Sequence, residues 1–369
     1  MTVNDKTLEN VYIIDNLGNK RRVKRIYIGV NGKAKKIADT GLTFDKSYKQ
    51  PTPLSHARGS LVATSIGDYA LFGGGGSVVD AYDTSLVRTT PTPLSSARQF
   101  LAATSIGDYA LFGGGGDYDV VDAYDTSLVR TTPTPLSQAR SKLAATSIGN
   151  YALFGGGGSS SSYSTNYSVV DAYDTSLVRT TPTPLSQARQ YLAATSIGNY
   201  ALFGGGRYSS GSSYSRNVDA YDTSLVRTTT STLGQSRGSL AATSIGDYAL
   251  FGGGDASASS YVFISAVEAY NTSLVRVIPA SFLSQARTKL AATAIGNYAL
   301  FGGGMCGNST YSDVVDAYDT SLVRTTRTPL SEARGSLAAT SIGDYALFGG
   351  GSYPYSDIVD AYSLQKILV

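Results

Sequence analysis

Residues 98–116 are Arg-Gln-Phe-Leu-Ala-Ala-Thr-Ser-Ile-Gly-Asp-Tyr-Ala-Leu-Phe-Gly-Gly-Gly-Gly, and residues 121–135 are Val-Asp-Ala-Tyr-Asp-Thr-Ser-Leu-Val-Arg-Thr-Thr-Pro-Thr-Pro. Seven copies of this unit fill the chain from about residue 51 to the end. A Leu-Ser-x-Ala-Arg segment or a close variant aligns them, and its arginine recurs every 40 to 50 residues, at Arg58, Arg98, Arg140, Arg189, Arg237, Arg287 and Arg334. This period is typical of propeller blades rather than of helical solenoids.

Each unit predicts four short strands. Leu101 to Ile106 is small and apolar, as a strand buried on both faces near a crowded axis would be, and Gly107-Asp108 supplies a tight turn. Tyr109 to Gly114 is the second strand, and its glycines allow close approach of a neighbouring blade. Val120 to Tyr124 is the third strand and Ser127 to Thr132 the fourth. No segment has a helical period, so the fold class is all-β.

These residues resemble the kelch family, in the arginine, the apolar strand, the Gly-Gly after the second strand, the tyrosine of the third strand and the Pro-x-Pro-Leu before the next arginine. The resemblance implies a seven-bladed kelch-type β-propeller of four antiparallel strands per blade over residues 41–369. Kelch repeats usually carry a tryptophan in the fourth strand, whereas this chain has no tryptophan. Near that place it has Leu86, Leu128, Leu177, Leu225, Leu274 and Leu322.

Residues 1–50 carry the basic excess of the chain, with eleven Lys and Arg against five Asp and Glu, while the remainder has nineteen against twenty-two. Residues 1–40 predict a basic β module, with strands at 11–14, 23–30 and 33–37 and an Asn31-Gly32 hairpin turn. Residues 20–36 hold eight basic and no acidic residues. A solvated hairpin face is the simpler interpretation of this run, and we expect no nucleic-acid binding.

The segment from Val23 to Ile37 also resembles a short module of tail and prophage-encoded proteins of phages of Gram-positive bacteria. The resemblance implies attachment of residues 1–40 to other virion or tail proteins. The start of the chain lacks the apolar stretch of a signal peptide, and no apolar run is long enough to cross a membrane. We therefore expect synthesis in the cytoplasm, no membrane insertion, and incorporation into a virion tail. A single cysteine, Cys306, agrees with a reducing compartment.

Two segments compete to complete the seventh blade. The sequence from Phe44 to Leu54 resembles that of residues 82–94 with two residues missing. We therefore predict that residues 42–49 form the closing outer strand of the seventh blade. Leu364 to Val369 is the alternative, because it follows the third strand of that blade directly.

The repeats differ mainly in the connection after the glycines, at the residue before Ala-Arg, and in the pair that follows the arginine. In a blade whose strands alternate in direction, these connections emerge on one face of the disc and the constant turns on the other. Ten of the 27 tyrosines lie at the varied positions among serine, glycine and asparagine, a composition typical of antibody-type binding surfaces. Drift of surface loops is the simpler alternative.

The predicted ligand-binding residues are the aromatic and selected polar side chains of these positions: Tyr118, Tyr163, Tyr167, Tyr191, Arg207, Tyr208, Tyr214, Tyr261, Phe263, Tyr311, Tyr353, Tyr355, Phe100 and Gln187. The seven aligned arginines are predicted to form structural ion pairs with the acid of the third strand, which is Asp80, Asp122, Asp171, Asp219, Glu268, Asp316 or Asp360. A ring of arginines that recognises an acidic ligand is the alternative.

Catalysis finds little support in the sequence. His56 is the only histidine and Cys306 the only cysteine, so no repeated general base and no zinc cluster is available. We expect no metal, no cofactor and no enzyme activity. Asp117 and Asp119 would at most bind calcium weakly.

The predicted function is that of a tail-associated receptor-binding or adhesion protein of a phage or prophage. It would bind a host-surface glycan or protein through the varied connections between the second and third strands. A cytosolic kelch adaptor for protein–protein interaction is the alternative, and a glycan-active enzyme is a third.

Overall fold

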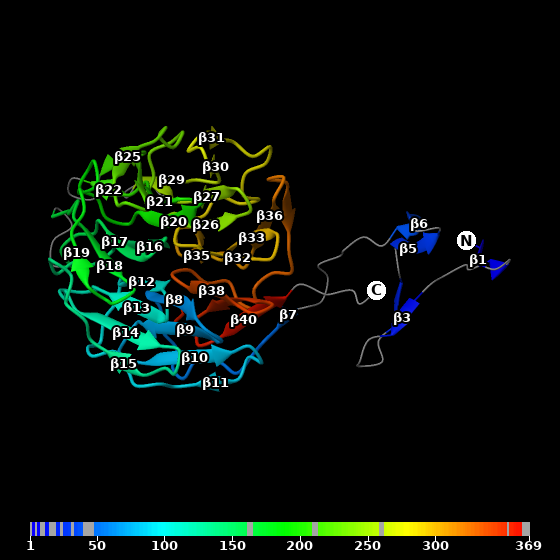
Figure 1. The fold of residues 1–369 in the computed structure, drawn as a ribbon, viewed down its shortest axis with the longest axis horizontal. Helices are drawn as coiled ribbons and strands as arrows, with labels where there is room; N and C mark the ends of the chain where they lie inside the picture. The colour runs from blue at the N-terminus through cyan, green and yellow to red at the C-terminus, as the bar shows by residue number, and fades with distance from the viewer. Residues whose placement is uncertain are drawn as a thin grey trace. The chain divides into compact units, whose positions relative to one another are not determined.

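The computed structural model describes residues 48–160, 165–208, 213–257, 262–352 and 354–363, and short strands among residues 2–39. Two compact units are present, Met1–Lys46 with Gln365–Val369, and Ser47–Leu364. The larger unit is all-β and forms a closed ring of seven four-stranded antiparallel sheets, a seven-bladed β-propeller (Figure 1). No described segment is a helix that could cross a membrane.

The four strands of each blade follow one another from the axis outward. The first strands are β8 (Leu61–Ile66), β12 (Ala102–Ile106), β16 (Ala144–Ile148), β20 (Ala193–Ile197), β26 (Ala241–Ile245), β32 (Ala291–Ile295) and β38 (Ala338–Ile342). The second strands are β9 (Tyr69–Gly74), β13 (Tyr109–Gly113), β17 (Tyr151–Gly155), β21 (Tyr200–Gly204), β27 (Tyr248–Gly252), β33 (Tyr298–Gly302) and β39 (Tyr345–Gly349). Each first strand contacts its counterparts in both neighbouring blades, and β38 contacts β8, which closes the ring.

The third strands are β10 (Val79–Asp83), β14 (Val121–Asp125), β18 (Val170–Asp174), β24 (Val218–Asp222), β30 (Val267–Asn271), β36 (Val315–Asp319) and β40 (Val359–Ser363). The fourth strands are β11 (Arg88–Thr89), β15 (Arg130–Thr131), β19 (Arg179–Thr180), β25 (Arg227–Thr229), β31 (Arg276–Val277), β37 (Arg324–Thr326) and β7 (Tyr48–Lys49). The sequence therefore predicted the fold class, the number of blades and the strand order correctly.

Two local predictions need correction. The first strands are not buried on both faces, because burial alternates along them and Ala103 and Ser105 are only half-buried. The leucines expected near a fourth-strand tryptophan lie instead in the preceding turn. Leu128 has a φ of 62°, and the Asp125 carboxylate accepts hydrogen bonds from the N–H groups of Ser127 and Val129. This side-chain cap holds the turn and leaves a fourth strand of two or three residues.

Neighbouring blades pack an aromatic ring against a glycine. A Cβ at Gly113 would lie 2.7 Å from the ring of Phe154 in the next blade, so any larger residue would displace that ring. The same Phe154 meets Tyr173 of its own blade edge to face, with ring centroids 6.0 Å apart. The contact recurs around the ring and ends with Gly349 against Phe72, from the seventh blade to the first. The glycines thus admit a side chain of the next blade.

The aligned arginines lie inside the blades and pair with the third-strand acid of the same blade. The pairs are Arg58–Asp80, Arg98–Asp122, Arg140–Asp171, Arg189–Asp219, Arg237–Glu268, Arg287–Asp316 and Arg334–Asp360. No arginine side chain of the set is more than 4 % exposed. These seven guanidinium groups are therefore not presented to an external ligand.

Replacing Arg189 by alanine leaves the Asp219 carboxylate buried without its main partner, and we predict a loss of about 3–5 kcal/mol of unfolding free energy. Arg227→Ala is the matched control, because its half-exposed guanidinium also contacts Asp219, at 3.3 Å. Its loss should cost only about 1 kcal/mol. Chemical denaturation of both variants makes the comparison, and equal losses would contradict the structural role of the buried pair.

The outer strand of the seventh blade comes from the N-terminal side of the propeller unit. Tyr48 pairs with Tyr362 and Lys49 with Ala361. The Tyr48 hydroxyl donates to Asp360, where the other blades place an arginine of the fourth strand. Its ring packs on Tyr362 with centroids 5.7 Å apart. Residues 42–47 and the competing segment Leu364 to Val369 lie outside the described residues.

Tyr48→Ala should lower the unfolding free energy by about 2 kcal/mol, because it removes an aromatic contact and a hydrogen bond to a buried carboxylate. Tyr48→Phe keeps the ring and should cost about 1 kcal/mol. A chain that ends at Ser363 should melt at the temperature of the full chain, since β7 already completes the blade. A large loss on this truncation, with little effect of Tyr48→Ala, would refute this account of closure.

Three two-stranded antiparallel pairs are described in the smaller unit. β1 (Thr2–Val3) pairs with β2 (Lys6–Thr7), and β3 (Tyr12–Ile14) with β4 (Lys20–Arg22). β5 (Arg25–Val30) pairs with β6 (Lys33–Asp39), with Val30 opposite Lys33. The Asn31-Gly32 turn itself lies outside the described residues.

Candidate ligand-binding site at the central mouth

Seven residues form a ring where the chain enters the first strand of each blade. We call them the ring residues: Ser60, Phe100, Lys142, Tyr191, Ser239, Lys289 and Ser336, each two positions after the aligned arginine. All have left-handed backbone conformations, with φ between 52° and 58°. Such a φ is uncommon outside glycine and costs about 1–2 kcal/mol per residue, so its recurrence in every blade requires a compensating interaction.

That interaction is a closed circle of backbone hydrogen bonds. The N–H of each ring residue donates to the carbonyl of the ring residue in the preceding blade, over 2.8–3.2 Å. Phe100 donates to Ser60, and Ser60 donates to Ser336, which completes the circle. Because only backbone atoms take part, the circle fixes the position of each ring residue without fixing its side chain.

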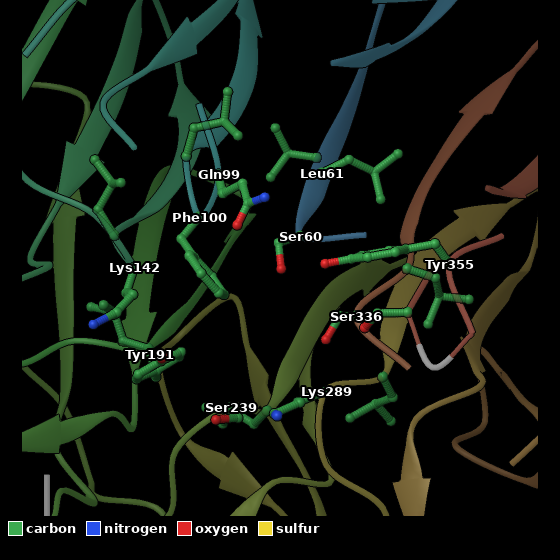
Figure 2. Close-up of a pocket in the computed structure, with 18 residues that line it drawn as sticks. Ser60, Leu61, Gln99, Phe100, Lys142, Tyr191, Ser239, Lys289, Ser336 and Tyr355 are labelled. Atoms are coloured by element: carbon green, nitrogen blue, oxygen red, sulfur yellow. The ribbon is translucent and has the colours of Figure 1, made fainter. Parts of the chain in front are cut away.

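The ring surrounds a cavity of about 510 Å³, which we call the mouth (Figure 2). In each blade the residue that follows the ring residue in sequence is a buried leucine that also lines the mouth: Leu61, Leu101, Leu143, Leu192, Leu240, Leu290 and Leu337. Val62, Gln99, Ser352 and Tyr355 complete the lining. A concave apolar base with a few polar groups at its rim is typical of a small-molecule site.

Longer connections between the second and third strands begin beside the ring. β22 (Arg207–Tyr208) pairs with β23 (Ser213–Tyr214), β28 (Asp255–Ser257) with β29 (Val262–Phe263), and β34 (Met305–Gly307) with β35 (Thr310–Tyr311). Their first residues pair with the residue just before the ring. Gln190 and Arg207, for example, exchange two backbone hydrogen bonds. The varied connections and the varied ring residues therefore share one region of the propeller.

A charged network occupies one side of the mouth. The Arg207 guanidinium contacts the Asp255 carboxylate at 2.6 Å and lies 4.9 Å from the ring centroid of Tyr191. Asp255 also accepts hydrogen bonds from the Tyr214 hydroxyl at 2.7 Å and the Thr288 hydroxyl at 2.9 Å. Both carboxylate oxygens are thus engaged, and burial together with Asp255 raises the pKa of Tyr214 above its usual range.

Two ring lysines adjoin this network. Lys142 Nζ lies 5.5 Å from the ring centroid of Tyr191, the same ring that Arg207 contacts. Desolvation lowers the pKa of Lys142, and Arg207 lowers it further. Desolvation and Arg207 also lower the pKa of Lys289, while Asp255 raises it. The local field on this side of the mouth is therefore positive.

The structure brings together only part of the predicted ligand-binding set. Phe100, Tyr191 and Tyr355 line the mouth, and Arg207 and Tyr214 support it from β22 and β23. Five predicted residues do not line it: Tyr118, Tyr167, Tyr208, Phe263 and Tyr311. Tyr118 is 43 % exposed, and the other four are half-buried. Tyr163, Tyr261 and Tyr353 lie outside the described residues.

Gln187 has a structural partner rather than a place in the mouth. Its side-chain oxygen accepts hydrogen bonds from the Ser215 hydroxyl at 2.7 Å and the Asn217 amide at 3.4 Å, so it holds the connection between the second and third strands of its blade. Gln285 does the same for Ser312 at 2.8 Å.

The prediction missed the two lysines and the three serines of the ring. They occupy the same position in their blades as Phe100 and Tyr191, two residues after the arginine, so the register of the repeat contained the signal. At this position the predicted set contained only the aromatic residues, Phe100 and Tyr191. The residue before a ring residue can also affect the site. A Cβ at Gly238 would lie 2.8 Å from the Arg207 side chain of the preceding blade, so a larger residue there would displace that side chain.

Neither His56 nor Cys306 belongs to a catalytic arrangement in the described residues. The His56 imidazole contacts the adjacent Ser55 hydroxyl at 3.2 Å, and Cys306 is a half-buried free thiol in β34. Within the part of the chain that the structure describes, no group of three or more His, Cys, Asp or Glu side chains could hold a metal ion.

No protein-family model matches this chain, and no curated protein matches it. Among the solved structures that resemble it is one described as "Structure of YjhT", with a TM-score of 0.61 at 12 % sequence identity. The match covers 75 % of this chain and 99 % of that one. At this identity the likeness shows the β-propeller fold alone. The kelch-type and phage-type resemblances rest on the sequence motifs.

Proposed function

We propose that this protein is a non-enzymatic recognition module whose mouth and surrounding connections bind a glycan on a host surface. The observation that carries the proposal is the contrast between a constant scaffold and one varied region. The backbone circle holds every ring residue at the same φ, while the side chains alternate among Ser, Phe, Lys and Tyr around a 510 Å³ recess. A recess of this size suits one small unit of a ligand.

The composition of the region supports binding over turnover. The described residues that line the mouth include no imidazole and no carboxylate, the groups that most often act as general acid or base. Tyr and Ser instead provide large amphipathic contact and adaptable hydrogen bonds. The recess favours a glycan, whereas a protein partner would use the outer connections more heavily.

We further propose that residues 1–40 attach the propeller to other tail proteins of a phage or prophage, and that the protein is made in the cytoplasm before assembly. This part of the proposal is supported by the resemblance of the segment 23–37 to a module of such proteins. The repeated blades agree with it, because loops on identical scaffolds can be exchanged without altering the core.

Binding of the intact protein to a glycan array and to candidate host cells tests the proposal. Replacing residues 159–168 and 207–217 by the short connection of the first blade should remove most of the binding, because it removes Arg207 and Tyr214 beside the mouth. The control is Val129→Ser with Val178→Ser, at residues 57 % exposed in turns between third and fourth strands. It should bind normally.

Unchanged binding after the loop replacement, or loss of binding in the valine control, would overturn the assignment of this region. Binding to isolated host proteins with none to glycans would favour a protein ligand instead.

A further inference from the structure

The charge at the mouth contrasts with that of the propeller as a whole. Residues 51–369 hold nineteen basic and twenty-two acidic residues, so the domain is slightly acidic. Yet Lys142 and Lys289 both line the mouth, and Arg207 adjoins it. Of the three lysines among the described propeller residues, two are ring residues. A general basic surface would not concentrate its lysines in this way.

The carboxylate nearest this cluster is already engaged. Asp255 uses one oxygen for Arg207 and Tyr214 and the other for Thr288, so both of its carboxylate oxygens already have partners. Within the described residues, Lys289 forms no salt bridge, although its backbone carbonyl takes part in the circle. Arg207 lowers the pKa of both lysines, and an anion bound beside either ammonium group would oppose that effect.

Aromatic faces and hydroxyl groups complete the mouth. Phe100 and Tyr191 meet edge to face with centroids 6.4 Å apart on one side, and Tyr355, which is 64 % exposed, lies across from them (Figure 2). Ser60, Ser239 and Ser336 occupy three of the seven ring positions. Aromatic faces pack against the C–H face of a sugar ring, and hydroxyl groups exchange hydrogen bonds with its oxygens.

We infer that the mouth binds a saccharide unit that carries a carboxylate, with Lys142 and Lys289 as the groups that hold the anion. This inference rests on the proposed function and specifies its ligand class. The anion would receive charge-assisted hydrogen bonds from one of the ring ammonium groups and a favourable charge from the other, while Phe100, Tyr191 or Tyr355 covers the ring. An acidic peptide also supplies carboxylates, but a recess ringed by serine and aromatic side chains fits a compact sugar ring better than an extended backbone.

The test uses the full chain and disaccharides of galacturonate, glucuronate and mannuronate, each beside its methyl ester, which keeps the skeleton and removes the charge. Isothermal titration calorimetry at neutral pH and low salt measures the affinity. At least one acid should bind about tenfold more tightly than its ester, because charge-assisted hydrogen bonds are lost in the ester. The difference should shrink as salt is added.

Lys142→Ser and Lys289→Ser should each weaken binding of the acid about tenfold and leave binding of the ester unchanged. Serine already occupies the ring in the first, fifth and seventh blades at the same φ, so these variants should fold. Their melting temperatures verify this. Lys49→Ser is the matched control, because it removes one exposed lysine in the outer strand β7 that does not line the mouth, and it should bind as the parent does.

Equal affinity for acid and ester, or full affinity in both lysine variants, would overturn the inference while leaving a neutral-glycan site and the proposed function intact. Equal binding of diglutamate or of inorganic phosphate would also overturn it, because the mouth would then recognise any anion. If the protein binds none of the acids and no glycan on the array, both the inference and the proposed function are contradicted.

Discussion

The circle of seven backbone hydrogen bonds at the ring residues is the constraint on which the site depends. It forces each ring residue into a left-handed conformation near 55°, and it places seven side-chain positions around one opening. The residues found there are Ser, Phe, Lys and Tyr. None is β-branched, in keeping with the steric cost of a branched Cβ at positive φ. Within that limit the hydrogen bonds of the circle do not depend on which side chain is present. The side chains that line the mouth can therefore change without a change in the fold.

The rest of the blade keeps this circle in place. Phenylalanines packed against the glycines of the preceding blade fix the spacing between sheets, and the buried arginine–acid pairs fix the start of each first strand to the third strand. In the fourth, fifth and sixth blades the connection after the second strand begins with a pair of backbone hydrogen bonds to the residue before the ring, as Arg207 does with Gln190. Their first residues are therefore positioned as firmly as the ring, and side chains such as Arg207 reach it.

The fold could be predicted from the sequence because the repeat occurs seven times. Comparing the seven copies distinguishes the constant residues of the scaffold from the residues that vary. The site followed only in part. Phe100 and Tyr191 were recognisable as variable strand-entry residues, but the φ of that position, and hence its arrangement around an opening, depends on hydrogen bonds between blades some 40 to 50 residues apart. Lys142 and Lys289 occupy the same variable position but were not included in the predicted set. Gln187 stands at a position that varies between blades, yet its side chain supports a connection, and variation alone does not reveal this role.

Replacing the four non-serine ring residues together, as Phe100→Ser, Lys142→Ser, Tyr191→Ser and Lys289→Ser, tests this account most directly. A crystal structure and a melting curve of the variant, with glycan binding measured on the same sample, give the result. The account predicts an intact circle of backbone hydrogen bonds, a melting temperature close to that of the parent, and no binding at the mouth. An opened ring, or a variant that keeps full binding, would contradict it.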